Sequence, residues 1–250
     1  MIELRGVHKS FGRQVVLDGV DFEVRRGETV ALLGPSGTGK SVLLKHIVGL
    51  LRPDSGDVLV DGQSVPNLSR AGLTALRLKV GYAFQMGALF DSMTVFENIR
   101  LGIADETQYR DEAYCDARVA ECLRLVNLLP EVGRKMPAEL SGGMRKRVGI
   151  ARAIAGRPSY LLYDEPTSGL DPVNADAMDD LIEQLQAELH ATSVVVSHDV
   201  RGSFKVADRI ALLHHGTIRK VGTAEDFVNA KDEVVREFLE RDFQLLEAGR

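Results

Sequence analysis

The chain has 250 residues, of which 44% are hydrophobic and 27% charged, so it can bury a large core as one large domain or two small ones. Its formal net charge of -5 argues against a nucleic-acid surface as its main feature, and no nucleic-acid partner is expected. No apolar stretch approaches a membrane span, and the N-terminal segment MIELRGVHKS lacks the apolar core of a signal peptide. We therefore expect a cytoplasmic protein that takes any membrane role through a partner.

The first part of the chain is predicted to contain strands around one buried helix. Short apolar segments alternate with turns over residues 1–30, which favours antiparallel strands. A buried strand, TVALL, then runs into Gly34, and the pattern SVLLKHIVGLL predicts a helix from Lys40 to about Gly49. A turn at residues 52–56 and a second strand pair near VLVDG follow.

The middle of the chain is predicted to be helical. Thr94 and Glu97 have capping-box spacing, and residues 109–126 are amphipathic. Strand signals are absent from about residue 85 to residue 157, so we predict a helical insertion there.

The two cysteines are too few for a disulfide scaffold. Cys115 and Cys122 share a helical stripe with Val119, Leu123 and Val126, which predicts a packing role for both.

Strand patterns return in SYLLYDE, SVVVSHD and RIALLH. A helix that Asp171 caps and Pro172 begins lies between the first two of them. Strand, helix and strand at this spacing predict a parallel sheet covered by helices.

The segment GPSGTGKS, residues 34–41, matches the phosphate-loop pattern after a strand and at the start of a helix, the context that supports such a match. Glycines let backbone N–H groups converge on phosphate oxygens, and the positive end of the helix adds its field. Lys40 would reach the β and γ phosphates, and the Ser41 hydroxyl would bind magnesium. The alternative is an incidental glycine-rich turn.

A magnesium nucleotide site also needs a carboxylate at the end of a neighbouring parallel strand. The segment YLLYDEP, residues 160–166, supplies two. Asp164 suits the metal, and Glu165 suits a base or orienter for the attacking water. Alone, such a segment is more often a strand meeting solvent, but the phosphate loop strengthens the functional interpretation.

The segment LSGGMRKR, residues 140–147, places Ser141 as a cap before Gly142 and Gly143 at the start of a helix. This helix start is a second backbone anion site. One nucleotide buried between the two sites would explain the pair, if the second site comes from another molecule. The basic residues 145–147 are predicted to form a solvated face near phosphate.

These motifs resemble those of the ATP-binding subunits of ABC transporters, whose signature LSGGQ is similar to LSGGM here, and they follow that family's order along nearly the whole chain. The resemblance implies an α/β fold: a P-loop NTPase (RecA-like) core with an antiparallel β subdomain and an inserted α-helical subdomain. The implied boundaries are a β subdomain and catalytic core at 1–84 and 158–225, a helical subdomain at 85–157 and a C-terminal helical tail at 226–250. In that family two subunits sandwich two ATPs, each signature loop covering the γ phosphate on the opposite phosphate loop.

The resemblance also implies functional roles for residues that would not be singled out individually. Phe11 is placed where an aromatic ring stacks on adenine. Gln85 matches the glutamine that touches the metal and the attacking water and links the core to the helical insertion. SGLDP, residues 168–172, resembles the loop that crosses the dimer interface, and His198 matches the histidine that contacts the γ phosphate.

The residues assigned to ATP are Phe11, Gly34, Pro35, Ser36, Gly37, Thr38, Gly39, Lys40, Ser41, Ser141, Gly142 and Gly143. The residues assigned to catalysis are Glu165, His198, Lys40 and Gln85. The residues assigned to Mg²⁺ are Ser41, Gln85 and Asp164.

One position departs from the family pattern, because Met144 replaces the signature glutamine. LSGGM with FQMGALFDSMTVFENI, residues 84–99, resembles a narrower branch, the ATPase subunits of Mla and MCE-type phospholipid transporters. The apolar residues 87–90 follow Gln85, where that family receives a helix of the membrane permease. Core packing is the alternative for these residues.

The C-terminal segment has apolar residues at helical spacing, namely Val235, Phe238, Leu239 and Phe243. They predict an amphipathic helix that packs either against its own domain or against a second copy of the chain.

We therefore expect a homodimeric ATPase, peripheral on the cytoplasmic face of the inner (cell) membrane. The resemblance implies that it powers phospholipid transport with integral-membrane permease subunits and an MCE lipid-binding subunit. The alternative is a soluble ABC-type ATPase without a permease, either an assembly factor or a DNA-repair factor. DNA-repair members carry long coiled coils or zinc cysteines that this chain lacks, whereas an assembly factor of this length is harder to exclude.

Overall fold

The computed structural model describes residues 1–248, with side chains up to residue 240, and divides the chain into two compact units. The first unit comprises residues 1–73 and 192–250, and the second comprises residues 74–191. Residues 249–250, the end of the predicted tail, lie outside the described residues.

The first unit contains an antiparallel sheet in the order β2-β1-β4-β5. Its strands are β1 (Ile2–Phe11), β2 (Gln14–Val24), β4 (Ser55–Val60) and β5 (Gln63–Ser64). From Val20 onward alternate side chains of β2, namely Val20, Phe22 and Val24, are buried, as expected for a sheet with one covered face. This sheet confirms the antiparallel strands predicted for residues 1–30 and near VLVDG.

A second group of strands in the first unit has the order β10-β9-β3-β8. Its strands are β3 (Thr29–Leu33), β8 (Thr192–Ser197), β9 (Arg209–His214) and β10 (Thr217–Gly222). Strand β3 runs parallel to β8 and to β9, whereas β10 is antiparallel to β9. Both β3 and β8 are buried along their whole length, which explains why these segments are nearly continuous apolar runs.

The helices of the first unit are short except for the last. They are α1 (Lys40–Ile47), the 3₁₀ helix η1 (Val65–Asn67), α8 (Val200–Val206), α9 (Ala224–Val228) and α10 (Glu233–Ala248). Helix α2 (Arg70–Leu78) begins in this unit and ends in the second.

Helix α10 packs against its own chain. Val235 and Leu239 are buried in a cluster with Leu33 of β3 and Phe227 of α9, and Phe238 packs against that cluster. Of the two alternatives for the tail, contact with its own domain is therefore the one observed at these positions. The side chain of Phe243 lies outside the described residues.

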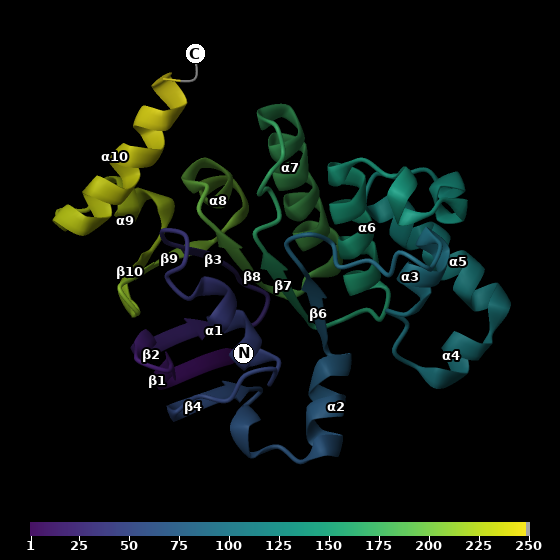
Figure 1. The fold of residues 1–250 in the computed structure, drawn as a ribbon, viewed down its shortest axis with the longest axis horizontal. Coiled ribbons are helices and arrows are strands. Elements are labelled where there is room, and N and C mark those ends of the chain that lie inside the picture. Colours follow the sequence, from purple (N-terminus) through teal and green to yellow (C-terminus); the bar gives the residue numbers. More distant parts are fainter. Residues whose placement is uncertain (249–250) are drawn as a thin grey trace. The chain divides into compact units, whose positions relative to one another are not determined.

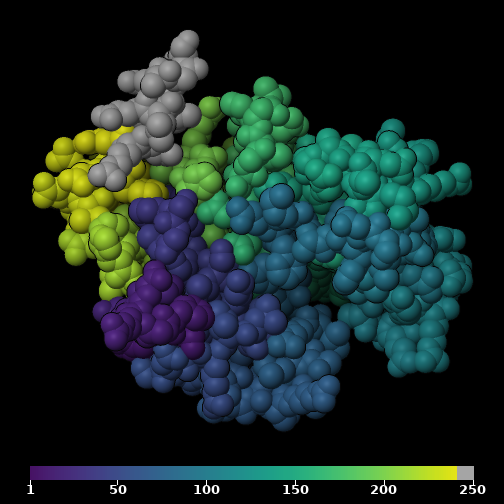
Figure 2. Space-filling model, viewed as in Figure 1, coloured from purple at the N-terminus to yellow at the C-terminus, as the bar shows by residue number. Residues whose placement is uncertain are grey.

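The second unit pairs two parallel strands with a group of helices (Figure 1). Its strands are β6 (Val80–Ala83) and β7 (Tyr160–Asp164). Its helices are α3 (Val95–Arg100), α4 (Glu106–Arg110), α5 (Glu112–Leu125), α6 (Gly142–Ile154) and α7 (Pro172–Leu189), with 3₁₀ helices η2 (Pro130–Arg134) and η3 (Pro137–Glu139). Between residues 85 and 157, all of them described, no strand occurs, and α3 to α6 form one continuous teal surface (Figure 2).

The structure of this part of the chain differs from the sequence-based prediction at three elements. Helix α2 and strand β6 were not predicted, since β6 has only four residues, VGYA, and its order comes from pairing with β7. The helix predicted for residues 109–126 is broken at Asp111, whose extended backbone ends α4 and whose side chain accepts a hydrogen bond from Tyr114 N–H to cap α5.

The buried stripe of α5 is confirmed. Cys115, Val119, Cys122, Leu123 and Val126 are each at most 2% exposed. Burial raises the pKa of the Cys122 thiol to about 11, so it stays protonated and packs as a small apolar side chain.

No helix within residues 1–248 combines the length and the apolar character that crossing a bilayer requires.

Candidate functional site

The phosphate loop links β3 to α1 in the first unit. Gly37 and Gly39 have φ values of 80° and 101°, in the left-handed region that glycine adopts without steric cost. A Cβ on Gly39 would lie 2.7 Å from a methyl carbon of Val16 in β2, so only glycine lets the loop lie this close to that strand. Lys40 is 5% exposed and its ammonium donates to the carbonyls of Gly34 at 2.7 Å and Pro35 at 3.1 Å. The loop therefore has the tight, glycine-dependent backbone of a phosphate cradle.

His198 emerges beside this loop. Leu33 of β3 pairs with Ser197 of β8 in parallel register, so Gly34 and His198 leave adjacent strands at the same edge. His198 is exposed, and Asp199 caps helix α8 by accepting a hydrogen bond from Gly202 N–H.

Phe11 ends β1 in the same unit. Its ring is 47% exposed, and the ammonium of Lys9 lies 5.5 Å from the ring centroid. Phe11 pairs with Gln14 at the hairpin whose second strand carries Val16, the residue against the phosphate loop. The first unit thus contains an exposed ring, a phosphate loop and a histidine.

The two candidate carboxylates end strand β7 in the second unit. Asp164 is 7% exposed and Glu165 is 8% exposed. The hydroxyl of Tyr82, on the adjacent strand β6, donates to Asp164 Oδ2 at 3.0 Å. Burial, together with the charge of Asp164, raises the pKa of Tyr82 well above its usual value, so this hydroxyl remains a donor. Tyr82 therefore orients the Asp164 carboxylate.

Glu165 has a left-handed backbone, with φ 51°. Such a conformation in a non-glycine residue costs about 1–3 kcal/mol and persists only where neighbouring contacts hold it. The turn that follows is closed by Ser168 N–H, which donates to the Glu165 carbonyl at 3.3 Å.

Gln85 follows β6 as Glu165 follows β7, and the register pairs Ala83 with Tyr163. Its side-chain amide donates to the hydroxyl of Ser168 at 3.3 Å. The structure thus brings Gln85 into contact with the loop of residues 168–172, which ends where Asp171 caps α7.

The second predicted anion site is the start of α6. Ser141 caps this helix, and its hydroxyl accepts a hydrogen bond from Met144 N–H at 3.2 Å. Ser141 and Gly142 are exposed, and a Cβ on Gly142 would meet nothing within 4 Å. The helix start is therefore open to a ligand from outside, as the Ser-Gly-Gly pattern predicts.

The residues present fit a magnesium nucleotide better than a metal held by protein alone. Within residues 1–248, no group of three or more His, Cys, Asp or Glu side chains could hold a metal ion. Magnesium in proteins commonly takes one or two side-chain ligands, and phosphate oxygens and water complete its shell. A single oriented carboxylate such as Asp164 suits that mode.

The comparison with protein families identifies the family to which a chain with this phosphate loop, capped helix start and pair of carboxylates belongs. Residues 17–168, more than half of the chain, match the family model described as ABC transporter.

The chain belongs to the ABC transporter family.

Three relatives of this ABC cassette are informative. A probable ribonucleotide transport ATP-binding protein, mkl, of Mycobacterium leprae is 40% identical over 95% of this chain and 68% of its own length. A sulfate/thiosulfate import ATP-binding protein of Caulobacter vibrioides is 41% identical over 92% of this chain and 67% of its own length. A solved dimeric ATP-binding cassette in a post-hydrolysis state, bound to ADP and Pi, is 32% identical and matches 89% of this chain and 98% of its own with a TM-score of 0.80.

These comparisons confirm the predicted fold class. The chain has the α/β fold of ABC ATPases, with antiparallel and parallel strands and with helices. The chain spans about two thirds of the length of the curated relatives that it matches.

One prediction about the cassette's signature helix is wrong. Residues 145–147 were expected to form a solvated basic face, but Lys146 is 8% exposed. Its ammonium donates to the carbonyls of Glu165 and Pro166, both at 3.0 Å. Arg145 is exposed as expected. The sequence around Lys146 could not show that it is buried, because the carbonyl of Pro166 that its ammonium contacts lies twenty residues further along the chain.

The apolar stretch after Gln85 is largely not core. Phe90 is 54% exposed, and Phe84 and Met86 are 39% and 78% exposed. The buried amide of Asn98 fixes this loop, because its side chain bonds both the N–H and the carbonyl of Phe90 and the carbonyl of Met93. Core packing was the alternative for residues 87–90. Phe90 is exposed and is therefore not part of the core, whereas Gly87 is buried.

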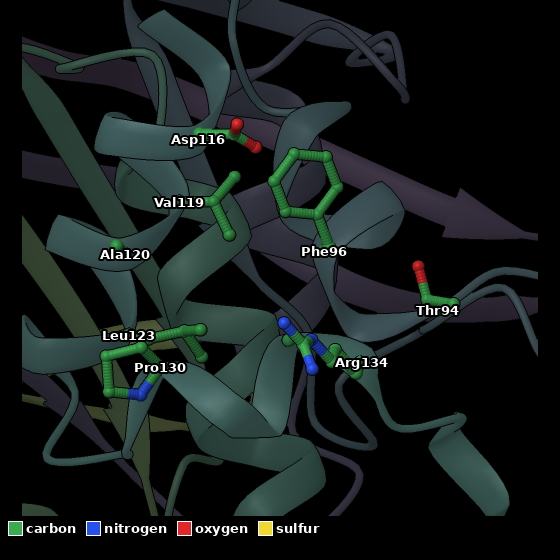
Figure 3. Close-up of a pocket in the computed structure, with 9 residues that line it drawn as sticks. Thr94, Phe96, Asp116, Val119, Ala120, Leu123, Pro130 and Arg134 are labelled. Carbon is green, nitrogen blue, oxygen red and sulfur yellow. The ribbon is translucent and has the colours of Figure 1, made fainter. Parts of the chain in front are cut away.

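A recess of about 380 Å³ lies among the helices of the same unit. The side chains of Phe96 and Val119 point toward each other across it, and Pro130 and Arg134 lie along another side (Figure 3). Its position was not predicted, since its walls come from three separate segments.

Proposed function

We propose that this chain is the ATP-hydrolysing subunit of an ABC transporter complex, and that it acts as a homodimer powering phospholipid transport through an Mla/MCE-type permease. Membership of the ABC transporter family does not by itself specify the transported substrate. The observation that carries the proposal is that one chain holds a glycine-dependent phosphate loop and a second, exposed helix start at Ser141.

The proposed chemistry is positioning with charge stabilisation. Bound ATP and Mg²⁺ supply the transferred phosphoryl group and neutralise its charge. Lys40 and the backbone of residues 34–41 hold the phosphates, and Phe11 stacks on the base. Asp164 and Ser41 hold the metal.

The attacking water has its own set of residues in this proposal. Glu165 accepts its proton, Gln85 touches both the metal and the water, and His198 contacts the γ phosphate.

The dimer is supported by the exposure of the signature. Ser141 and Gly142 are exposed and Gly143 is half-buried, so this helix start offers a second backbone anion site that a ligand can reach from solvent. A phosphate held by a partner's loop suits this site. The similarity to a dimeric cassette bound to ADP and Pi supports the dimer.

The membrane partner is supported by exposed apolar side chains on both sides of Gln85. Phe84, Met86 and Phe90 present aromatic and thioether surface of the kind enriched in protein interfaces. We propose that a cytoplasmic helix of the permease docks there, which places the chain on the cytoplasmic face of the inner membrane. An MCE lipid-binding subunit completes the proposed complex.

The transported substrate is the most specific part of the proposal. Phospholipid follows from the combination of LSGGM with the segment 84–99, whereas the relatives are named for ribonucleotide and for sulfate or thiosulfate. In the proposed complex the cargo would meet the permease and the MCE subunit rather than this chain, so these names do not decide it.

Glu165→Gln tests the proposed chemistry. The variant should bind MgATP as the parent does, lose turnover by about a hundredfold or more because the base is removed, and elute as a dimer when loaded with ATP. Turnover at the parent rate would refute the role of Glu165. A loaded variant that stays monomeric at high concentration would refute the shared nucleotide.

A further inference from the structure

Lys146 is a buried cation in the signature helix α6 that the proposed chemistry does not use. It is 8% exposed, and burial lowers the pKa of its amine while the charge of Glu165 opposes that shift. Removing a lysine from water is unfavourable, so its ammonium needs partners. It finds two, the adjacent carbonyls of Glu165 and Pro166, each 3.0 Å from Nζ.

Those two carbonyls belong to a strained turn. Glu165 has φ 51°, which is uncommon for a residue with a side chain. Ser168 N–H reaches the Glu165 carbonyl at a longer 3.3 Å. An ammonium has three N–H donors, so Lys146 can give each of the two successive carbonyls its own hydrogen bond, whereas a main-chain N–H has one proton to donate.

We propose that Lys146 is a positioning residue for Glu165: its ammonium holds the left-handed main chain so that the carboxylate keeps its direction at the end of β7. The inference rests on the proposed function of Glu165. Because α6 starts at Ser141, the same contact ties the position of Glu165 to the helix that carries the signature.

The main test compares Lys146→Met with the parent in the full chain. Methionine retains most of the apolar stem but donates no hydrogen bond, so the variant should fold. We expect kcat for MgATP hydrolysis to fall about tenfold to a hundredfold, while KM and the binding of a fluorescent ATP derivative stay unchanged. A merely structural lysine would not separate kcat from KM in this way.

Two further variants sharpen the test. Lys135→Met removes the same charge from an exposed position of the same unit and should keep the parent kcat. Lys146→Arg keeps the hydrogen-bond donors. Its decrease in log kcat relative to the parent should be at most half of the decrease in Lys146→Met. A folded Lys146→Arg protein as inactive as Lys146→Met would overturn the proposal.

The outcomes separate this inference from the proposed function. If Glu165→Gln is inactive and Lys146→Met turns over at the parent rate, the inference alone is wrong. If Glu165→Gln turns over at the parent rate, the role of Glu165 itself fails. An equal loss of ATP binding and turnover in Lys146→Met would also overturn the inference.

Discussion

At the scale of single residues, Tyr82 supports the carboxylate of Asp164, the proposed metal ligand. Its hydroxyl donates to Asp164 Oδ2 at 3.0 Å, and its ring stacks on Phe84 with centroids 4.2 Å apart. A buried carboxylate is costly unless it is hydrogen-bonded. Partners of this kind also fix the orientation of metal ligands.

Tyr82→Phe should separate these two roles, because the ring and its stacking remain while the hydroxyl is lost. We expect the free energy of unfolding to fall by about 1.5–3 kcal/mol, the usual worth of a hydrogen bond to a charged group. The Mg²⁺ concentration for half-maximal hydrolysis should rise about tenfold. Urea unfolding and a magnesium titration of the ATPase rate measure the two effects.

Tyr114→Phe is the matched control, since it removes a hydroxyl from a half-buried tyrosine of α5 in the same unit. It should change neither quantity appreciably. If Tyr82→Phe behaves like this control, the hydroxyl does not orient Asp164.

At the scale of elements, α6 packs against the rest of its unit through glycines. A Cβ on Gly149 would lie 2.9 Å from Gly87 Cα, and a Cβ on Gly87 would lie 2.7 Å from the Arg145 carbonyl. Arg152 adds two hydrogen bonds, each 2.8 Å long, to the carbonyls of Gly87 and Ala88. The signature helix and the loop after Gln85 are therefore in backbone contact.

Gly149→Ala should destabilise the cassette, although alanine is the better helix former. The helix gains up to about 1 kcal/mol in propensity, but the main chain at Gly87 must move, and overpacking of this kind costs about 1–3 kcal/mol. Thermal unfolding should show a lower midpoint.

The contrast is Gly72→Ala in helix α2. There the new Cβ would meet the side chain of Leu68 at 3.1 Å, which can give way, so we expect an unchanged or higher midpoint. Equal shifts in both variants would mean that the contact with Gly87 has no special cost.

The sequence predicted those elements whose ends are encoded locally. Thr94 with Glu97, Ser141 and Asp171 cap their helices as predicted, because a cap needs only residues three apart. Strand β6 and the buried state of Lys146 depend on segments far along the chain. Their own composition, a four-residue apolar run and a lysine in a basic cluster, carries no signal of either.

At the scale of the whole molecule, the parts fall into two units. The phosphate loop, Phe11 and His198 belong to the first, and Gln85, Ser141 and the carboxylates of β7 belong to the second. Motif order could predict all of these parts, since each is a short contiguous segment. The sequence could place an apolar stretch after Gln85 but could not show whether Phe90 is exposed, because hydrogen bonds with the side chain of Asn98, eight residues further along, hold this loop.

Phe90→Glu should detach the chain from its permease. A tagged parent chain purified from detergent-solubilised membranes should recover an integral-membrane protein, together with phospholipid detected by mass spectrometry. A charge in the apolar contact should reduce that recovery about thirtyfold or more, the loss expected from an interface hot spot of at least about 2 kcal/mol. ATP hydrolysis by the isolated variant should stay at the parent rate.

Val228→Glu is the control, because Val228 is 63% exposed at the end of α9 in the other unit. It adds the same charge and should leave recovery of the membrane protein unchanged. Reproducible recovery of soluble partners alone with the parent chain would contradict the transporter proposal and favour a soluble ABC-type ATPase. A recovered permease carrying another cargo would refute only the phospholipid part of the proposal, because the residues proposed for hydrolysis are assigned to ATP and Mg²⁺ and not to a cargo.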